Sequence, residues 1–312
     1  MTFTEMSVSK GQLISASRRT DIPAFYAEWF MNRIRAGYVE VQNPFNSKQI
    51  SHISLKPEDV IAIVFWTRNA LPLMPYLDEL EERGYHFYFH WTITGYPRIL
   101  DGRTPDAARM IEGMHALADR LSADHIIWRY DPVVFSNKTD VEWHAENFSK
   151  LAEKIAGASK RCFFSYVDFY RKTQRKMKSL EPEVHVHELA AIEKRAFAMR
   201  LVDIATRHRI RLHACCEEEL LDLPGVGQSR CVDIRFVRSL YPDVEAEIPD
   251  GPTRPACGCS TSRDIGAYDS CLFRCAYCYA NSEFDTASVP RNDRHDPHHP
   301  MLIPALEAEP AE

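Results

Sequence analysis

The stretch VIAIVFW, residues 60–66, is an uninterrupted apolar run with the length of one β-strand. It is far shorter than the roughly 20 apolar residues that cross a bilayer. Its lack of polar alternation favours a strand that is buried on both faces. Five similar runs occur before residue 216: QLISAS (12–17), YHFYFHW (85–91), HIIWRY (125–130), RCFFSYV (161–167) and RIRLHAC (209–215). The sequence therefore predicts six buried strands.

Amphipathic helical patterns separate these runs, over residues 24–37, 70–84, 104–121, 140–157 and 187–208. Strands that alternate with helices predict βα units and a parallel sheet. No G-x-G-x-x-G follows the first run, which disfavours an open dinucleotide-binding sheet. We therefore expect an α/β fold, a full or partial (β/α) barrel, with a Cys-rich C-terminal segment.

The organisation changes after residue 220, where Pro, Gly and polar residues replace the repeating pattern. We predict a barrel domain over 1–220, a Cys-rich cluster-binding segment over 221–285, and a disordered or loosely packed tail over 286–312. The formal net charge of −6 gives no general attraction to nucleic acid or to anionic membranes. The N-terminus lacks a basic region followed by an apolar run, so we expect a cytoplasmic protein without membrane contact.

Charged and aromatic residues gather where each predicted strand ends, which is the ligand side of parallel α/β folds. The candidate catalytic residues there are Arg18, Arg68, Arg129, Asp131 and Glu217. Guanidinium groups suit a substrate that carries a carboxylate or a phosphate. The alternative is a ring of Arg–Asp pairs that only tie the loops together. The sequence is compatible with both interpretations.

The run YRKTQRKMK, residues 170–178, has five cations in nine positions after the fifth predicted strand. Such a run can bind the backbone of a nucleic acid. The interpretation that we prefer is the solvated face of a helix.

The nine cysteines indicate metal or redox chemistry rather than a disulfide framework, because a reducing compartment is expected. Three have the spacing C-x3-C-x2-C, and we call Cys271, Cys275 and Cys278 the Cys triad. A further set, the Cys quartet, comprises Cys215, Cys231, Cys257 and Cys259. Four thiolates can hold zinc or a complete iron–sulfur cluster. Three thiolates on a cubane cluster leave one iron open to another ligand.

Cys216 is an alternative to Cys215 as a member of the Cys quartet. Neighbouring residues on a strand point to opposite faces, and the sequence does not decide which of the two thiols faces the others.

The stretch CLFRCAYCYA, residues 271–280, resembles the cluster motif of the radical S-adenosylmethionine superfamily. Its Tyr-Cys-Tyr-Ala ending is similar to the branch of spore photoproduct lyase. Nearly the whole chain also resembles a bacterial family of unknown function, the DUF1848 type, through ISASRRTDIPAFY, RYDPV and CGCSTSRDIGAYDSC.

The first resemblance implies a 4Fe–4S cluster on the Cys triad, with S-adenosylmethionine bound at its open iron. An electron from the cluster would then break the S–C5′ bond of S-adenosylmethionine, and the resulting 5′-deoxyadenosyl radical would abstract hydrogen from a substrate. Tyr277 would pack beside the adenine or the cluster. The Cys quartet would hold a second cluster. An electron donor such as a flavodoxin or ferredoxin is implied, with an unknown small molecule or a nucleic acid as substrate.

The chain departs from that superfamily in two respects. The motif usually follows the first strand but lies here beyond the sixth, so we expect the C-terminal segment to fold back across the open end of the barrel. No Gly-Gly-Glu-Pro-like stretch follows the second predicted strand, where VFWTRN stands instead. The alternative to radical chemistry is an iron–sulfur or zinc-binding protein that carries electrons or binds nucleic acid.

Overall fold

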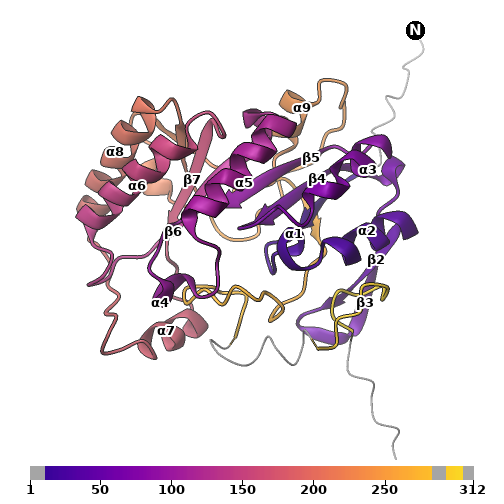
Figure 1. Ribbon diagram of the computed structural model, residues 1–312, viewed down its shortest axis with the longest axis horizontal. Helices are drawn as coiled ribbons and strands as arrows, with labels where there is room; N and C mark the ends of the chain where they lie inside the picture. Colours follow the sequence, from indigo (N-terminus) through magenta and orange to yellow (C-terminus); the bar gives the residue numbers. More distant parts are fainter. Residues whose placement is uncertain (1–10, 283–292, 305–312) are drawn as a thin grey trace, which may run out of the picture.

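The computed structural model describes residues 11–282 and 293–304. An eight-stranded sheet lies at its centre, with the order β10-β1-β4-β5-β6-β7-β8-β9 and parallel pairing throughout (Figure 1). Its strands are β1 (Gln12–Ala16), β4 (Val60–Thr67), β5 (Phe87–Thr92), β6 (Ile126–Val133), β7 (Arg161–Tyr166), β8 (Arg211–Ala214), β9 (Val226–Gln228) and β10 (Ser262–Asp264). Because β10 and β9 stand at the two ends of the order, the sheet is open.

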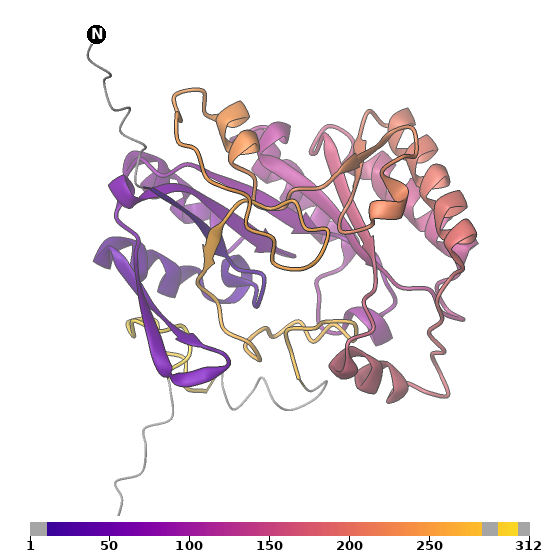
Figure 2. The ribbon, with the colours of Figure 1, turned by 180° about the vertical axis from the view of Figure 1, so that it is seen from behind.

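The helices are α1 (Ile22–Phe25), α2 (Ala27–Ala36), α3 (Leu77–Glu82), α4 (Arg98–Asp101), α5 (Ala107–Arg120), α6 (Val141–Ile155), α7 (Arg171–Lys178), α8 (Ala191–Arg207) and α9 (Ile234–Leu240). The helices α2, α3, α5, α6 and α8 cover one face of the sheet and bury most of the apolar core against it (Figure 1). The C-terminal segment, with α9, crosses the opposite face (Figure 2). The helices that alternate with the central strands are therefore on one side, as in part of a (β/α) barrel.

The six predicted strands correspond to β1 and to β4 through β8. The α/β fold class is confirmed, as a parallel sheet consistent with a partial barrel, and the Cys-rich C-terminal region is present. Within the described residues, no helix is both long enough and apolar enough to cross a membrane.

Four strands were not predicted. The strands β2 (Tyr38–Asn43) and β3 (Asn46–Ser54) form a separate antiparallel hairpin. The strands β9 and β10 have three residues each, too few for a periodic pattern. Residues 221–282 thus add one strand to each edge of the same sheet, β9 beside β8 and β10 beside β1.

The prediction of a loosely packed tail over 286–312 does not hold for residues 293–304, while residues 286–292 and 305–312 lie outside the described part. The side chain of Trp29 donates to the carbonyl oxygen of His299 at 2.9 Å, and Arg33 Nη2 donates to that of His298 at 2.8 Å. Leu302 and Ile303 are buried in the main core. Short apolar groups inside a Pro- and His-rich stretch therefore dock it on α2.

Candidate functional site

The inner face of the sheet, which the C-terminal segment covers, becomes polar toward the carboxyl ends of the strands. The layer of side chains nearer the amino ends of the strands is apolar and includes Val64, Tyr88 and Ile127. Two residues further along the same strands stand Trp66, His90 and Arg129. Strand alternation places both layers on one face, so chemistry-bearing side chains lie at the carboxyl edge, where ligands bind in parallel α/β folds.

The Cys triad lies on the loop that follows β10, and this loop runs along the carboxyl edge between α4 and α7 (Figure 1). Burial raises the pKa of Cys271 well above its usual value, and the thiols of Cys278 and Cys275 raise it further. Burial also raises the pKa of Cys275 to about 12, against the lowering effect of Arg68. The three sulfur atoms thus share one electrostatic environment.

The Cys triad loop is packed closely on the end of α4. The amide of Ala276 donates to the carbonyl oxygen of Leu100 at 2.8 Å, and that of Arg103 donates to the carbonyl of Phe273 at 2.7 Å. Gly102 has a φ of +60°, and a Cβ there would lie 2.3 Å from the carbonyl oxygen of Arg274. Only glycine permits this approach without moving the loop.

A buried polar network anchors the same loop to the sheet. Arg68, at the end of β4, pairs with Asp101 at 3.3 Å and donates to the hydroxyl of Tyr277. The hydroxyl of Tyr277 donates in turn to Asp101, which also accepts from Thr94 at 2.9 Å. Tyr277 lies beside the Cys triad, but its hydroxyl is committed to this network. Asp101 had no sequence signal because it lies at the end of a four-residue helix.

The cationic run forms α7, and its inward side also holds the Cys triad loop. Lys176 is 3% exposed, and its Nζ donates to the carbonyl oxygens of Cys278 and of Asn281, the latter at 3.0 Å. Burial lowers the pKa of Lys176, while Cys278 and Cys275 act to raise it. Lys172 and Arg175, which are exposed, contact Ser282. The preferred interpretation of a solvated face thus fails for Lys176.

The Cys quartet gathers at the other side of the inner face, and Cys216 joins it. The sulfur atoms of Cys215 and Cys231 are 3.8 Å apart, and the amide of Val232 donates to the sulfur of Cys259 at 3.5 Å. The pKa of Cys257 is lowered, first by the thiol of Cys216 and then by that of Cys259. Both Cys215 and Cys216 therefore face the set, because the left-handed φ of +60° at Cys216 breaks the strand alternation.

Within the described residues, no three His, Cys, Asp or Glu side chains are placed to enclose a single metal ion. The thiols of the Cys triad and of the Cys quartet are all free. Each set supplies the donor type for a metal or a cluster, and its side chains would have to turn to bind one ion.

Two arginines contact the sulfur atoms of the Cys quartet and Cys216. Arg129 Nη1 donates to the sulfur of Cys231 at 3.1 Å, and Arg254 Nε donates to that of Cys216 at 3.0 Å. Each also has a carboxylate partner, Asp131 for Arg129 and Asp168 for Arg254. Arg254 was not predicted, because it lies in an irregular stretch without a strand to mark its position.

The remaining candidates, Arg18 and Glu217, lie at the ends of β1 and β8. The Arg18 guanidinium lies within electrostatic reach of Cys259 and Cys231. Glu217 Oε1 accepts from the amide of Tyr166 at 2.8 Å, and burial raises the pKa of Glu217 to about 7. The structure thus brings Arg18, Arg129 and Asp131 to the quartet side and Arg68 to the triad side, whereas Glu217 supports the end of β7.

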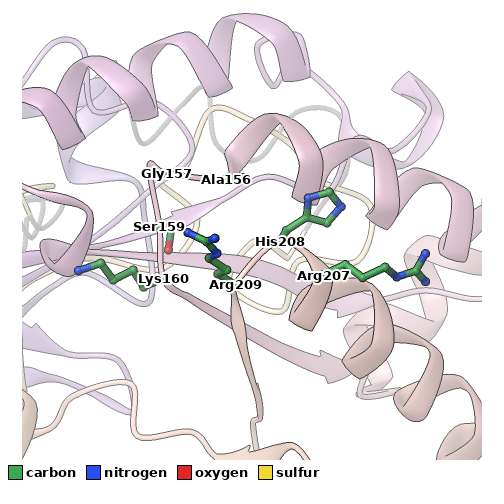
Figure 3. A pocket seen from close by; sticks show the side chains of 7 residues that line it. All are labelled: Ala156, Gly157, Ser159, Lys160, Arg207, His208 and Arg209. Atoms are coloured by element: carbon green, nitrogen blue, oxygen red, sulfur yellow. The ribbon is translucent and has the colours of Figure 1, made fainter.

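A hollow with a volume of about 460 Å³ lies at the opposite edge, beside the amino ends of β7 and β8 (Figure 3). Lys160 and Arg207 line it, but their side chains extend in opposite directions in Figure 3. Lys160 pairs with Asp124 at 2.6 Å, and Arg207 Nε donates to the carbonyl oxygen of Asp203 at 3.2 Å. These cations do not converge on one point.

Residues 13–280 match the family described as Domain of unknown function (DUF1848). Because the match spans most of the chain, the protein belongs to this family. Among curated proteins, none matches. A solved structure titled "putative alpha-L-fucosidase", from Bacteroides thetaiotaomicron VPI-5482, is similar over 70% of this chain and 79% of its own, at 11% identity and a TM-score of 0.29. That score is too low to support an argument about fold or function.

Proposed function

We propose that this protein is a radical S-adenosylmethionine enzyme with a 4Fe–4S cluster on the Cys triad. The observation that carries the proposal is the position of the triad. All three thiols lie on one loop at the carboxyl edge of a parallel sheet, directly after the strand β10 that pairs with β1. Three thiolates match the donor type and number that a cubane cluster with one open iron requires.

The charges around the Cys triad support an anionic group at this place. Ligand thiols must lose their protons, and a neighbouring cation lowers the pKa of a thiol. Arg68 acts in this way on Cys275, and the cation of Lys176 lies close to Cys275 and Cys278. In this proposal Arg68 and Lys176 offset the negative charge of the thiolates and hold their loop in place.

When bound, the cluster supplies the electron that splits S-adenosylmethionine into methionine and a 5′-deoxyadenosyl radical, which takes a hydrogen atom from the substrate. The reductant is an electron-transfer protein of the flavodoxin or ferredoxin class. This chain's own residues position the loop and exclude water. Tyr277 keeps the loop fixed through Asp101 and Arg68, and its ring lies edge-on against that of Tyr96 at 5.6 Å.

The topology supports the proposal. The motif is late in the chain, but β10 is the edge strand next to β1, so the Cys triad follows the first strand in spatial order. The C-terminal segment returns along the inner face of the sheet and adds this strand. In space, the relation between strand and motif thus resembles that of the superfamily, although the order along the chain differs.

For the Cys quartet we propose a second iron–sulfur cluster. Zinc is the specific alternative at this place. A tetrahedral zinc site with Zn–S bonds of about 2.3 Å holds its sulfurs about 3.8 Å apart, and the sulfurs of Cys215 and Cys231 have a separation of 3.8 Å. Bound zinc would favour a structural role for the quartet and would leave the triad proposal unchanged.

The test is anaerobic reconstitution of the full chain, with measurement of iron, sulfide and zinc. EPR spectra of the reduced protein with and without S-adenosylmethionine then report whether the nucleoside reaches the iron. We expect a changed signal and formation of 5′-deoxyadenosine. Cys275→Ala should abolish both, and Cys162→Ala is the matched control, since Cys162 is a buried core residue on β7. Cleavage retained in Cys275→Ala would refute the proposal.

Intact clusters without any cleavage would instead favour an electron carrier. A colourless protein that contains zinc and no iron would remove the iron–sulfur proposal altogether.

A further inference from the structure

Three polar groups converge on the indole of Trp66 at the end of β4. The guanidinium carbons of Arg18 and Arg129 lie 5.1 Å and 5.0 Å from ring centroids of Trp66. The imidazole of His90 stacks on the same indole, with ring centroids 4.4 Å apart and an interplanar angle of 19°. Stacking on an aromatic face fixes the plane of a guanidinium and leaves its N–H edge free to bind.

Arg18 differs from the other arginines of this edge in its partners. Arg68, Arg129 and Arg254 each contact their own carboxylate, from Asp101, Asp131 and Asp168 respectively. The Nη2 atom of Arg18 is buried and has no hydrogen-bond partner among the described residues. An unsatisfied buried donor costs about 1–3 kcal/mol, so its presence requires an explanation.

The nearest acid, Asp264 on β10, is already occupied. Its Oδ2 accepts from the hydroxyl of Ser15 at 2.9 Å and from the amide of Arg18 at 2.8 Å. Its Oδ1 accepts from Ser17 at 2.6 Å and from the amide of Gly266 at 3.1 Å. The carboxylate therefore holds the backbone at the end of β1 and leaves the Arg18 side chain available.

His90 supplies a second unused polar atom in the same layer. Its Nε2 donates to the carbonyl oxygen of Cys231 at 2.6 Å. Since a carbonyl oxygen only accepts, Nε2 carries the proton of this contact, and Nδ1 is the second polar atom of the ring. This Nδ1 is buried and has no partner within the described residues. Two buried polar atoms without a partner among the described residues, one on Arg18 and one on His90, thus flank Trp66.

We propose that Arg18 is the receptor for an oxyanion group of the substrate, a carboxylate or a phosphate, bound at its free Nη2 atom beside Trp66 and between the Cys triad and the Cys quartet. This inference rests on the proposed function, because it names the substrate class of that site. The carbonyl oxygen of Arg18 accepts from the hydroxyl of Tyr279 at 2.9 Å, and Tyr279 directly follows Cys278 of the triad. The guanidinium itself lies within electrostatic reach of Cys259 and Cys231.

A role for Arg18 as a hydrogen-bond donor to the quartet sulfurs is the competing explanation. Arg129 already has that role, with Nη1 at 3.1 Å from the sulfur of Cys231. No hydrogen bond joins the Arg18 side chain to a sulfur among the described residues, although two of the thiols are near. The free N–H edge of Arg18 is therefore assigned to a ligand.

The test is calorimetric titration of the anaerobically reconstituted full chain with two probes, inorganic phosphate and succinate. We expect one of the probes to bind with a stoichiometry of one. Arg18→Gln should weaken that binding by about tenfold or more, because a charge-assisted and bidentate contact is lost. Arg18→Lys keeps the charge, so its affinity for the anion should lie between those of the wild type and Arg18→Gln. Arg19→Gln is the matched control, since Arg19 is adjacent but pairs with Asp264 at 3.8 Å.

Titration with phosphate tests for a phosphate group on the substrate, and titration with succinate tests for a carboxylate group. Failure of both probes to bind the wild type, or equal weakening by Arg18→Gln and Arg19→Gln, would overturn the inference. It would also be overturned if Arg18→Gln lost iron or affinity for S-adenosylmethionine and kept the anion. A wild type that binds the anion through Arg18 but cleaves no S-adenosylmethionine would refute the proposed function alone. Circular dichroism spectra of each variant establish that it is folded.

Discussion

The buried ion pair between Arg68 and Asp101 gives the sharpest test of how the Cys triad is held. The side chains are 8% and 4% exposed, and their charged atoms are 3.3 Å apart. Arg68→Met removes the cation and, among the described residues, leaves the carboxylate with Thr94 and Tyr277 as its side-chain donors. Removal of one partner from a buried pair costs about 3–5 kcal/mol, because the other charge stays buried. We expect a loss of this size in the free energy of unfolding.

The matched control is Arg98→Met on the neighbouring helix α4. Arg98 pairs with Asp106 at 2.5 Å, but their side chains are 59% and 81% exposed. A surface pair contributes about 0–1 kcal/mol, so the two substitutions should differ by about 2 kcal/mol or more. The assay is urea unfolding of the metal-free full chain at pH 7, with the midpoint and the slope compared between variants.

The same pair of variants should also separate in iron binding. Arg68 acts to lower the raised pKa of Cys275, and ligand thiols bind iron as thiolates. Arg68→Met should therefore retain less iron after reconstitution than Arg98→Met at the same pH. Equal stability and equal iron content in the two variants would refute the claim that this network anchors the triad.

Three further predictions follow from single contacts. Lys176→Met should lower iron retention on desalting, because Nζ no longer donates to the carbonyl oxygens of Cys278 and Asn281. Lys178→Met, on the exposed side of α7, should not lower it. Equal losses of iron in the two variants would contradict this role of Lys176. Cys231→Ala should lower the iron content by roughly half and leave reductive cleavage measurable, and a loss of all iron would show that the two sets are not independent sites. Burial lowers the pKa of His144 to about 4, so its stabilising contribution is present above pH 6.5 and is lost as the pH falls toward 4. His144→Gln should thus flatten the fall in unfolding free energy over that range by about 3 kcal/mol, as measured by urea unfolding at several pH values, and an unchanged slope would contradict the assignment.

The parallel core was predictable because its signal is local. Each strand from β4 to β7 is an apolar run followed by a helix, and burial on both faces produces such runs. The strands β9 and β10 were not predictable, since three residues carry no period and their pairing depends on partners far away in the chain. The packing of residues 293–304 depends on α2 in the same way, through contacts such as that between Trp29 and His299.

The candidate site was predictable in composition but not in its pairings. The sequence separated the cysteines into a triad and a quartet, but it did not predict that Cys216 would join the quartet through a left-handed backbone. Nor did it distinguish Arg18 from the other arginines at the strand ends. That distinction depends on which carboxylates already accept other hydrogen bonds. Asp264 accepts from the backbone amide of Arg18, and it lies 246 residues further along the chain.

The spatial order of the strands also changes where a nucleoside-binding segment should be sought. Counted from β10, the second strand is β1 rather than β4, so the segment to compare is SRRTD, residues 17–21, and not VFWTRN. This segment also lacks a Gly-Gly-Glu-Pro-like stretch, and its backbone is held by Asp264 through Ser17 and the amide of Arg18. Cluster binding and S-adenosylmethionine binding are therefore separable claims. Iron in the triad with an EPR signal that S-adenosylmethionine leaves unchanged would preserve the first and refute the second.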